Sequence, residues 1–219
     1  MLYLDVPFTE KNAAKRLGAR WNPNMKKWYV EKRFDYPKFA KWILNGEGEM
    51  DVICDHVFLV VGQRKCYRCG NDIPVITFAI EKYCHFWNED YYEEPPYYEW
   101  NRQDIHITPD MPDILDIEEY RLFSEYLDEC YNYHLGYSRT AGGSYMANHC
   151  LACNSLQGDF FLNQEVDSPF FIDSPEKAAK LTLYRINLPY DKVMDLGINL
   201  SSADWMLKQF ATIKEFDWK

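Results

Sequence analysis

The chain contains two C-x-x-C turns, KCYRCG at residues 65–70 and HCLACN at residues 149–154. Two residues between the cysteines let the backbone turn tightly enough to direct both sulfurs at one point. Gly70 and Asn154 follow the turns, and both residue types tolerate positive φ. Four thiolates from two such turns make the tetrahedral ligand set that is typical of structural Zn²⁺. The predicted ligands are Cys66, Cys69, Cys150 and Cys153.

Other interpretations of these cysteines remain open. The chain has seven cysteines and begins without a secretory signal, which disfavours a disulfide framework. A redox C-x-x-C usually stands alone at a helix start, so a redox pair or unpaired core cysteines are the weaker alternatives. A site with four bound sulfurs has no open position for water, so the zinc is expected to be structural and not catalytic. Because Cys69 and Cys150 are 81 residues apart, a long insertion separates the two halves of the site.

Composition bounds the class of protein. Of the 219 residues, 47% are apolar and 17% are aromatic, which predicts a globular chain. The strongest apolar run, VFLVV at 57–61, is far shorter than a membrane span and is typical of a buried strand. The first residues do not form a signal peptide, so we expect no membrane and a cytoplasmic location. The common phosphate-loop, nucleophile-elbow, dinucleotide and HExxH motifs are absent, which favours a non-enzymatic role.

Charge is distributed unevenly along the chain. Residues 1–46 contain ten lysines and arginines against four acidic residues, a net charge of +6. The remaining 173 residues contain fourteen against thirty, a net charge of −16. Such asymmetry predicts that the two parts meet different partners.

Residues 1–46 are predicted to form a small basic α+β module. Strands are expected at 2–6 and in a hairpin over 20–30, with one helix from an N-cap at Thr9 to residue 17 and a second from Asp35. The run VPFTEKNAAKRLGARWNPNMKKWYV at 6–30 resembles a small bacterial domain of unknown function. That domain recurs beside plasmid primases and other DNA-handling proteins, so the resemblance implies an association with nucleic acid.

Basic and aromatic side chains alternate in this module. Cations neutralise phosphates and aromatic faces stack on unpaired bases, so single-stranded nucleic acid is the predicted ligand. The alternatives are that the two tryptophans form the module core and that the charges form a solvated face. The predicted contact residues are Lys11, Lys15, Arg16, Arg20, Trp21, Lys26, Lys27 and Trp28.

Residues 51–219 are predicted to form a zinc-stapled α+β domain with antiparallel strands. Strands at 51–62 and 73–80 flank the first cysteine turn, and a strand leads into the second. An acidic insertion at 84–138 has a net charge of −12; prolines predict no regular structure over 88–113, and a helix beyond is expected to reach His134. Further helices are expected from Ser174 and from a cap at Ser201 or Ser202. The cysteine turns with the QGDFFL run resemble uncharacterised bacterial zinc-ribbon-like proteins.

The insertion suggests an alternative function, a protein-interaction or immunity factor that engages a basic protein partner. Its predicted anchors are Tyr91, Tyr92, Tyr97, Tyr98 and Trp100.

Other candidate chemistry is sparse. His149 is an alternative ligand, and His56 with Cys54 or His85 with Cys84 is an alternative metal pair. Asp159 is the one carboxylate to follow, with an N-cap as its ordinary role. The favoured interpretation is a non-enzymatic zinc-binding protein associated with nucleic acid; an enzyme with an unrecognised site stays open.

Overall fold

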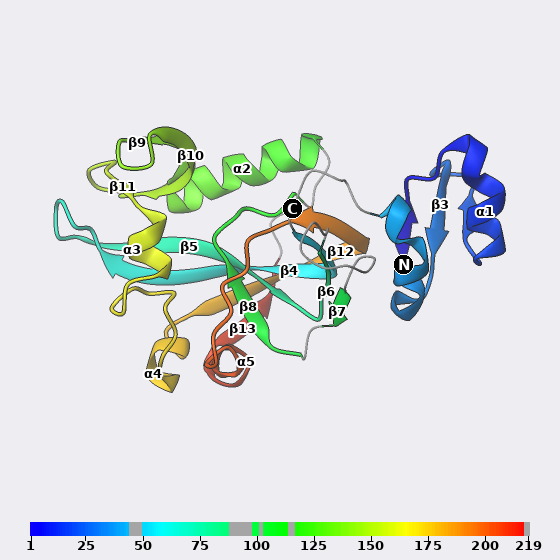
Figure 1. Cartoon of the computed structure of the whole chain (residues 1–219). Helices are drawn as coiled ribbons and strands as arrows, with labels where there is room; N and C mark the ends of the chain where they lie inside the picture. Colours follow the sequence, from blue (N-terminus) through cyan, green and yellow to red (C-terminus); the bar gives the residue numbers. More distant parts are fainter. Residues whose placement is uncertain (44–49, 88–97, 101–102, 114–116, 217–219) are drawn as a thin grey trace. The chain divides into compact units, whose positions relative to one another are not determined.

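The computed structural model describes residues 1–43, 50–87, 98–100, 103–113 and 117–216. Helices and strands are both present, so the predicted α+β class is confirmed (Figure 1). The chain forms two compact units. The first comprises Met1–His56, Lys82–Arg102 and Asn187–Leu196, and the second Val57–Glu81, Gln103–Ile186 and Gly197–Lys219. None of the helices in the described ranges is long and apolar enough to span a bilayer.

The first unit is built on short strands. β3 (Lys27–Val30) pairs antiparallel with β2 (Arg20–Asn22) and β1 (Leu2–Leu4), as the predicted hairpin requires. β1 also pairs in parallel with β12 (Thr182–Asp195). β6 (Cys84–Trp87) pairs with the beginning of β4 (Met50–Lys65) and with β7 (Tyr98–Trp100).

The helices of this unit differ from the prediction. Phe8–Glu10 is a 3₁₀ turn that leads into α1 (Lys11–Arg16), so Thr9 does not act as an N-cap. Arg33–Trp42 is a long 3₁₀ helix with Pro37 inside it. Proline lacks the N–H that an α-helix uses at that position, which favours the irregular form. The buried core comprises Leu2, Leu4, Ala14, Ala19, Val30, Tyr36, Phe39, Ala40, Trp42, Ile43, Ile53 and Cys84.

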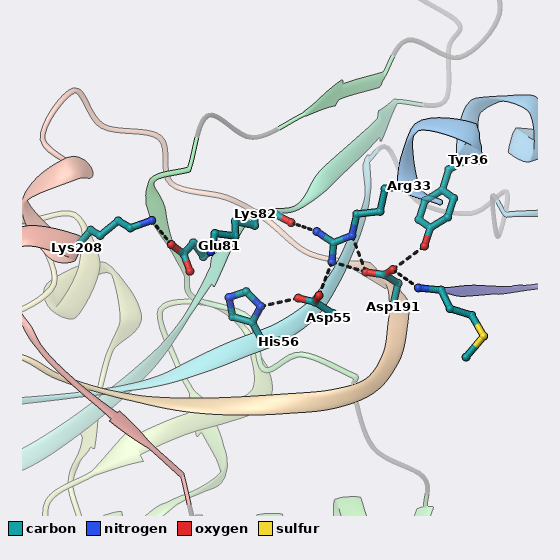
Figure 2. A network of polar contacts seen from close by, with 9 residues as sticks. Arg33, Tyr36, Asp55, His56, Glu81, Lys82, Asp191 and Lys208 are labelled. Carbon is teal, nitrogen blue, oxygen red and sulfur yellow. Dashed lines mark hydrogen bonds and ion pairs between the residues drawn. The ribbon is translucent and has the colours of Figure 1, made fainter. Parts of the chain in front are cut away.

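A polar network holds distant segments of the first unit together (Figure 2). Asp191, which is 2% exposed, accepts hydrogen bonds from Arg33 at 2.5 and 3.0 Å and from the Tyr36 hydroxyl at 2.5 Å. Arg33 also pairs with Asp55 at 3.0 Å and donates to the carbonyl oxygen of Lys82 at 2.6 Å. The buried Asp191 carboxylate is thus neutralised by the partly exposed Arg33, so removal of Arg33 would leave a buried charge without its guanidinium.

The second unit is organised on a long hairpin. β4 pairs with β5 (Asp72–Glu81) in antiparallel register from Val57↔Ile80 to Lys65↔Asp72, which confirms the predicted strand, turn and strand. β8 (Ile105–Thr108) adds to β5, so the prediction that 88–113 lacks regular structure is wrong there. Ile105 and Ile107 are buried in this strand. The prolines on which the prediction rested give no information about such a pairing with a distant strand. β13 (Thr212–Glu215) pairs in parallel with β12.

A three-stranded antiparallel sheet carries the second cysteine turn. It contains β9 (Tyr133–Ser138), β10 (Gly143–His149) and β11 (Leu156–Gln157). The helix α2 (Ile117–Tyr131) precedes it and ends at Asn132, which has a φ of 53°. The predicted extension of this helix to His134 is therefore wrong, because a left-handed residue stops the helix and starts β9.

Three short helices complete the second unit. α3 (Asp159–Asn163) follows β11, and α4 (Pro175–Ala178) begins at the predicted cap Ser174, whose hydroxyl accepts from the Lys177 N–H at 3.4 Å. α5 (Trp205–Phe210) has Asp204 at its N-cap, so the predicted caps at Ser201 and Ser202 are wrong.

Candidate metal centre and candidate nucleic-acid interface

The two cysteine turns of the second unit bring four sulfurs together. Cys66 follows β4 directly, and Cys150 follows β10 directly. The four Sγ atoms lie within 4.8 Å of one another, with Cys66–Cys153 at 3.7 Å and Cys69–Cys150 at 3.6 Å. Sulfurs bound to one tetrahedral ion at about 2.3 Å lie about 3.8 Å apart. The donor set therefore fits a single tetrahedral metal ion.

Both turns have the same backbone geometry. The N–H of Cys66 donates to the Asn71 carbonyl at 2.8 Å, and the N–H of Cys150 donates to the Ser155 carbonyl at 2.9 Å. Gly70 and Asn154 each donate back to the first cysteine of their turn, at 2.9 and 2.8 Å, and have φ values of 76° and 54°. The predicted positive φ at these two positions is confirmed. Two turns of equal shape each direct a pair of sulfurs to one point.

Polar side chains from β11 and the residue before it surround the sulfurs. The Ser155 hydroxyl lies 3.3 Å from Cys66 Sγ and 3.2 Å from Cys153 Sγ. The buried Gln157 amide donates to Cys66 Sγ at 3.5 Å and to the Ser155 carbonyl at 2.8 Å. Such partners orient ligands and disperse thiolate charge. Sequence reasoning missed both residues, although each lies just after the second turn.

The environment makes the thiols unequal. Burial disfavours the Cys66 thiolate, but hydrogen bonds from Ser155 and from the backbone of Cys69 and Arg68 outweigh it and lower the pKa of Cys66 to about 5. The Asn71 backbone favours a thiolate at Cys69, yet burial and the neighbouring cysteine sulfurs raise the pKa of Cys69 to about 12. Close-packed thiolates repel one another in this way unless a cation lies between them.

The alternative ligands do not join this group. The His149 ring stacks on His134 with centroids 3.9 Å apart, and its Nδ1 lies 3.0 Å from the Ala147 carbonyl oxygen. Within the described ranges, the four cysteines are the only group of three or more possible ligands with metal-site spacing, and neither Cys54 nor Cys84 belongs to such a group with its neighbouring histidine. Burial raises the pKa of Cys54 and of Cys84 to about 12, as expected of inert core thiols.

The first unit contains a pocket of about 620 Å³ with an aromatic and basic lining. Trp21 is 49% exposed and packs edge to face on the half-buried Trp28, with centroids 5.6 Å apart. Phe8 is 79% exposed, and Lys11 Nζ lies 3.7 Å from its ring centroid. Trp21 is therefore not part of the module core, whereas the half-buried Trp28 packs against that core, so the interpretation of the tryptophans as core is wrong for Trp21 alone.

The predicted contact residues divide into two sets. Those that line the pocket are Lys11, Trp21, Lys26, Lys27 and Trp28. The others lie outside the lining: Lys15 and Arg16 are exposed on α1, and Arg20 on β2 pairs with Glu31 at 2.7 Å. Lys27 pairs with Asp5 at 3.3 Å, so Asp5 places one carboxylate among the cations. Phe8 also lines the pocket and was not predicted as a contact residue; the available signal in the sequence was an aromatic residue between Pro7 and the basic residue Lys11.

The predicted partner anchors are largely beyond what the structure describes. Tyr91, Tyr92 and Tyr97 lie outside the described residues. Tyr98 and Trp100 belong to β7, where their backbones pair with Phe86 and Cys84. A basic protein partner for this segment stays a prediction.

Asp159 is the first residue of α3 and not its N-cap, which is Gly158. Burial, with the Asp110 charge as a second cause, raises the pKa of Asp159 to about 7. Its carbonyl oxygen accepts a hydrogen bond from Asn163 at 3.0 Å. Asp159 is thus partly protonated at neutral pH.

Similarity to known proteins is confined to the first unit. Residues 1–43 match the family described as a domain of unknown function, DUF5710. Two proteins named DNA primase TraC, both from Escherichia coli, are 50% identical to this chain over 44 and 40 residues. These segments are 20% and 18% of this chain but 4% and 3% of the primases. No solved structure matches the chain. The resemblance of residues 1–43 to a primase-associated domain is thereby confirmed; the zinc-ribbon resemblance of the cysteine turns gains no support.

Proposed function

We propose that this protein binds single-stranded nucleic acid through the pocket of residues 1–43 and carries a structural Zn²⁺ on its four clustered cysteines. The main support for the nucleic-acid proposal is Trp21. This side chain is exposed and lies beside Trp28 in a pocket that three lysines also line. A small module that leaves a tryptophan exposed does not bury the large apolar surface of that side chain. Stacking of the indole ring on unpaired bases would explain why Trp21 lies at the surface.

The cations complete the argument for the pocket. Lys11 and Lys26 have no carboxylate partner among the described residues, and Lys27 shares only the exposed Asp5. Ammonium groups beside aromatic faces bind backbone phosphates while the rings take the bases. The matching relatives are named as DNA primases, which agrees with this ligand class.

Zinc is the proposed metal because four thiolates in a tetrahedral set favour it, with iron as the other ion that accepts this set. A site filled by four sulfurs holds the two cysteine turns together and does no chemistry on a substrate. The metal therefore secures β10 and β11 to the long hairpin within the second unit.

Fluorescence anisotropy with a labelled oligo-dT of about 15 nucleotides tests the nucleic-acid proposal. Base stacking is worth about 1–3 kcal/mol, so we expect Trp21→Ala to weaken binding by about five- to one-hundred-fold. Trp205→Ala is the matched control, because Trp205 is 44% exposed and lies in the second unit.

The dependence of the oligonucleotide affinity on salt concentration is a second test of the same contact. Three phosphate contacts predict that the logarithm of affinity falls with the logarithm of salt concentration at a slope of about −2. If Trp21→Ala binds the oligonucleotide as tightly as the unmodified chain, the pocket is not the contact surface. Equal losses in both tryptophan variants would overturn the proposal as well.

A further inference from the structure

The second unit contains a separate cavity of about 560 Å³ next to the first cysteine turn. Arg64 and Lys65 border it from the end of β4, and Lys177 and Lys180 border it from the region of α4. The ring of Phe161, half exposed on α3, forms part of the wall. Its volume is in the range of small-molecule sites.

Two of its four cations make no ion pair among the described residues. Lys65 pairs with Asp72 at 2.9 Å, and Lys177 pairs with Asp173 at 2.9 Å. Arg64 donates to the Phe161 carbonyl oxygen at 3.1 Å but makes no ion pair with any residue that the structure describes. The side chain of Lys180 makes none either, within the same ranges. A half-buried guanidinium and a nearby ammonium whose hydrogen bonds are not taken up by a carboxylate are suited to an anion, although the Glu165 charge also acts on Arg64.

The rest of the lining restricts which class of ligand could supply the anionic group. Phe161 offers a flat apolar face, and Leu181 and Pro169 extend the apolar surface. Glu165 and Asp167 also line the cavity and form no ion pair with described residues, so they are available to accept from hydroxyl or amino groups. A simple anion such as phosphate alone would leave the apolar wall and both carboxylates unused. A ligand with an anionic end, hydroxyl donors and a planar ring uses all three.

We propose that this cavity binds a nucleoside phosphate, with the phosphate on Arg64 and Lys180 and the base against Phe161. The site lies in the second unit and shares no residue with the pocket of Trp21, so it is independent of the function proposed above. The same chemistry is offered by a free nucleotide and by the phosphorylated end of a strand.

Isothermal titration with AMP and with adenosine tests the site on the full chain. We expect AMP to bind at least about tenfold more tightly than adenosine, since hydrogen bonds to charged groups contribute about 1.5–3 kcal/mol. Arg64→Gln is expected to remove that difference. Arg68→Gln is the matched control, because Arg68 lies four residues further on, in the first cysteine turn, and does not line the cavity. Where Arg64→Gln fails to fold, Lys180→Gln replaces it, since Lys180 is exposed.

A Trp21→Ala background separates the two sources of the phosphate. A short 5′-phosphorylated oligo-dT that binds more tightly than its 5′-hydroxyl form, in an Arg64-dependent way, assigns the site to strand ends. Arg64-dependent binding of AMP alone assigns it to free nucleotides. If neither AMP nor the phosphorylated strand depends on Arg64 or Lys180, the proposal is overturned.

Discussion

Replacement of Asp159 by asparagine is expected to make the stability of the second unit much less dependent on pH. Burial, aided by the charge of Asp110, raises the pKa of Asp159 to about 7 from its ordinary value of 3.8. Between these values the folded state binds more protons than the unfolded state. Stability therefore falls as the pH rises through this window, and the full cost is present above pH 7.

The magnitude follows from the two pKa values. One pKa unit corresponds to about 1.4 kcal/mol, so the ionisation of Asp159 costs the folded state about 2 kcal/mol at pH 5 and about 4 kcal/mol at pH 8. The unmodified chain should lose about 2–3 kcal/mol between these pH values through this group alone. Tyr133 and Tyr145 lie close to Asp159, and their raised pKa values keep both uncharged over this range.

Urea unfolding at several pH values between 5 and 8, followed by far-ultraviolet circular dichroism, measures this loss. We expect Asp159→Asn to be more stable than the unmodified chain by about 2 kcal/mol at pH 5 and by about 4 kcal/mol at pH 8, with little change of its own between these pH values. Asp113→Asn removes an exposed carboxylate and serves as the control. If Asp159→Asn loses as much stability between pH 5 and pH 8 as the unmodified chain does, the raised pKa is refuted.

Two further predictions test the cross-links of the fold. Cys69→Ser should lose bound zinc and its cooperative thermal transition, because a structural zinc contributes roughly 10–16 kcal/mol to the free energy of folding. Cys130→Ser, which also replaces an exposed cysteine, should keep both. Metal analysis and calorimetry of the two variants measure these outcomes. Asp191→Ala should cost about 3 kcal/mol or more, because the Tyr36 hydroxyl loses its hydrogen bond to a buried carboxylate and Arg33 loses the closer of its two carboxylate partners. Denaturant unfolding beside the exposed Asp195→Ala measures this, and equal losses in the two variants would contradict it.

Features encoded by adjacent residues were predictable from the sequence. The C-x-x-C spacing and the following Gly70 or Asn154 specify each turn, because the turn is closed by backbone hydrogen bonds within six residues. The strands on either side of Cys66 and Cys69 follow from apolar runs. Ser174 before Pro175 identifies the start of α4. In each case the deciding interaction is local.

Features that depend on distant partners were not predictable. Asp191 is one of many acidic residues in the sequence, and its partners Tyr36 and Arg33 lie 155 and 158 positions away. β8 becomes a strand because the edge of β5 accepts it, in spite of the flanking prolines. The exposure of Trp21 could not be read from its neighbours either, since a tryptophan between polar residues fits a core and a surface equally well.

The pocket and the core of the N-terminal segment differ in which parts of the chain supply their residues. Every residue that lines its pocket lies at or before Trp28, within the segment that matches the family. The hydrophobic core of the N-terminal segment also contains Ile53 and Cys84, which lie outside the segment. The charge of Arg33 is likewise neutralised by a residue from outside it, Asp191. The pocket therefore depends directly on residues of the matched segment, whereas the buried contacts also depend on residues that lie outside it. Substitutions at Asp191 are accordingly expected to change stability before they change nucleic-acid binding, and substitutions at Trp21 to do the reverse.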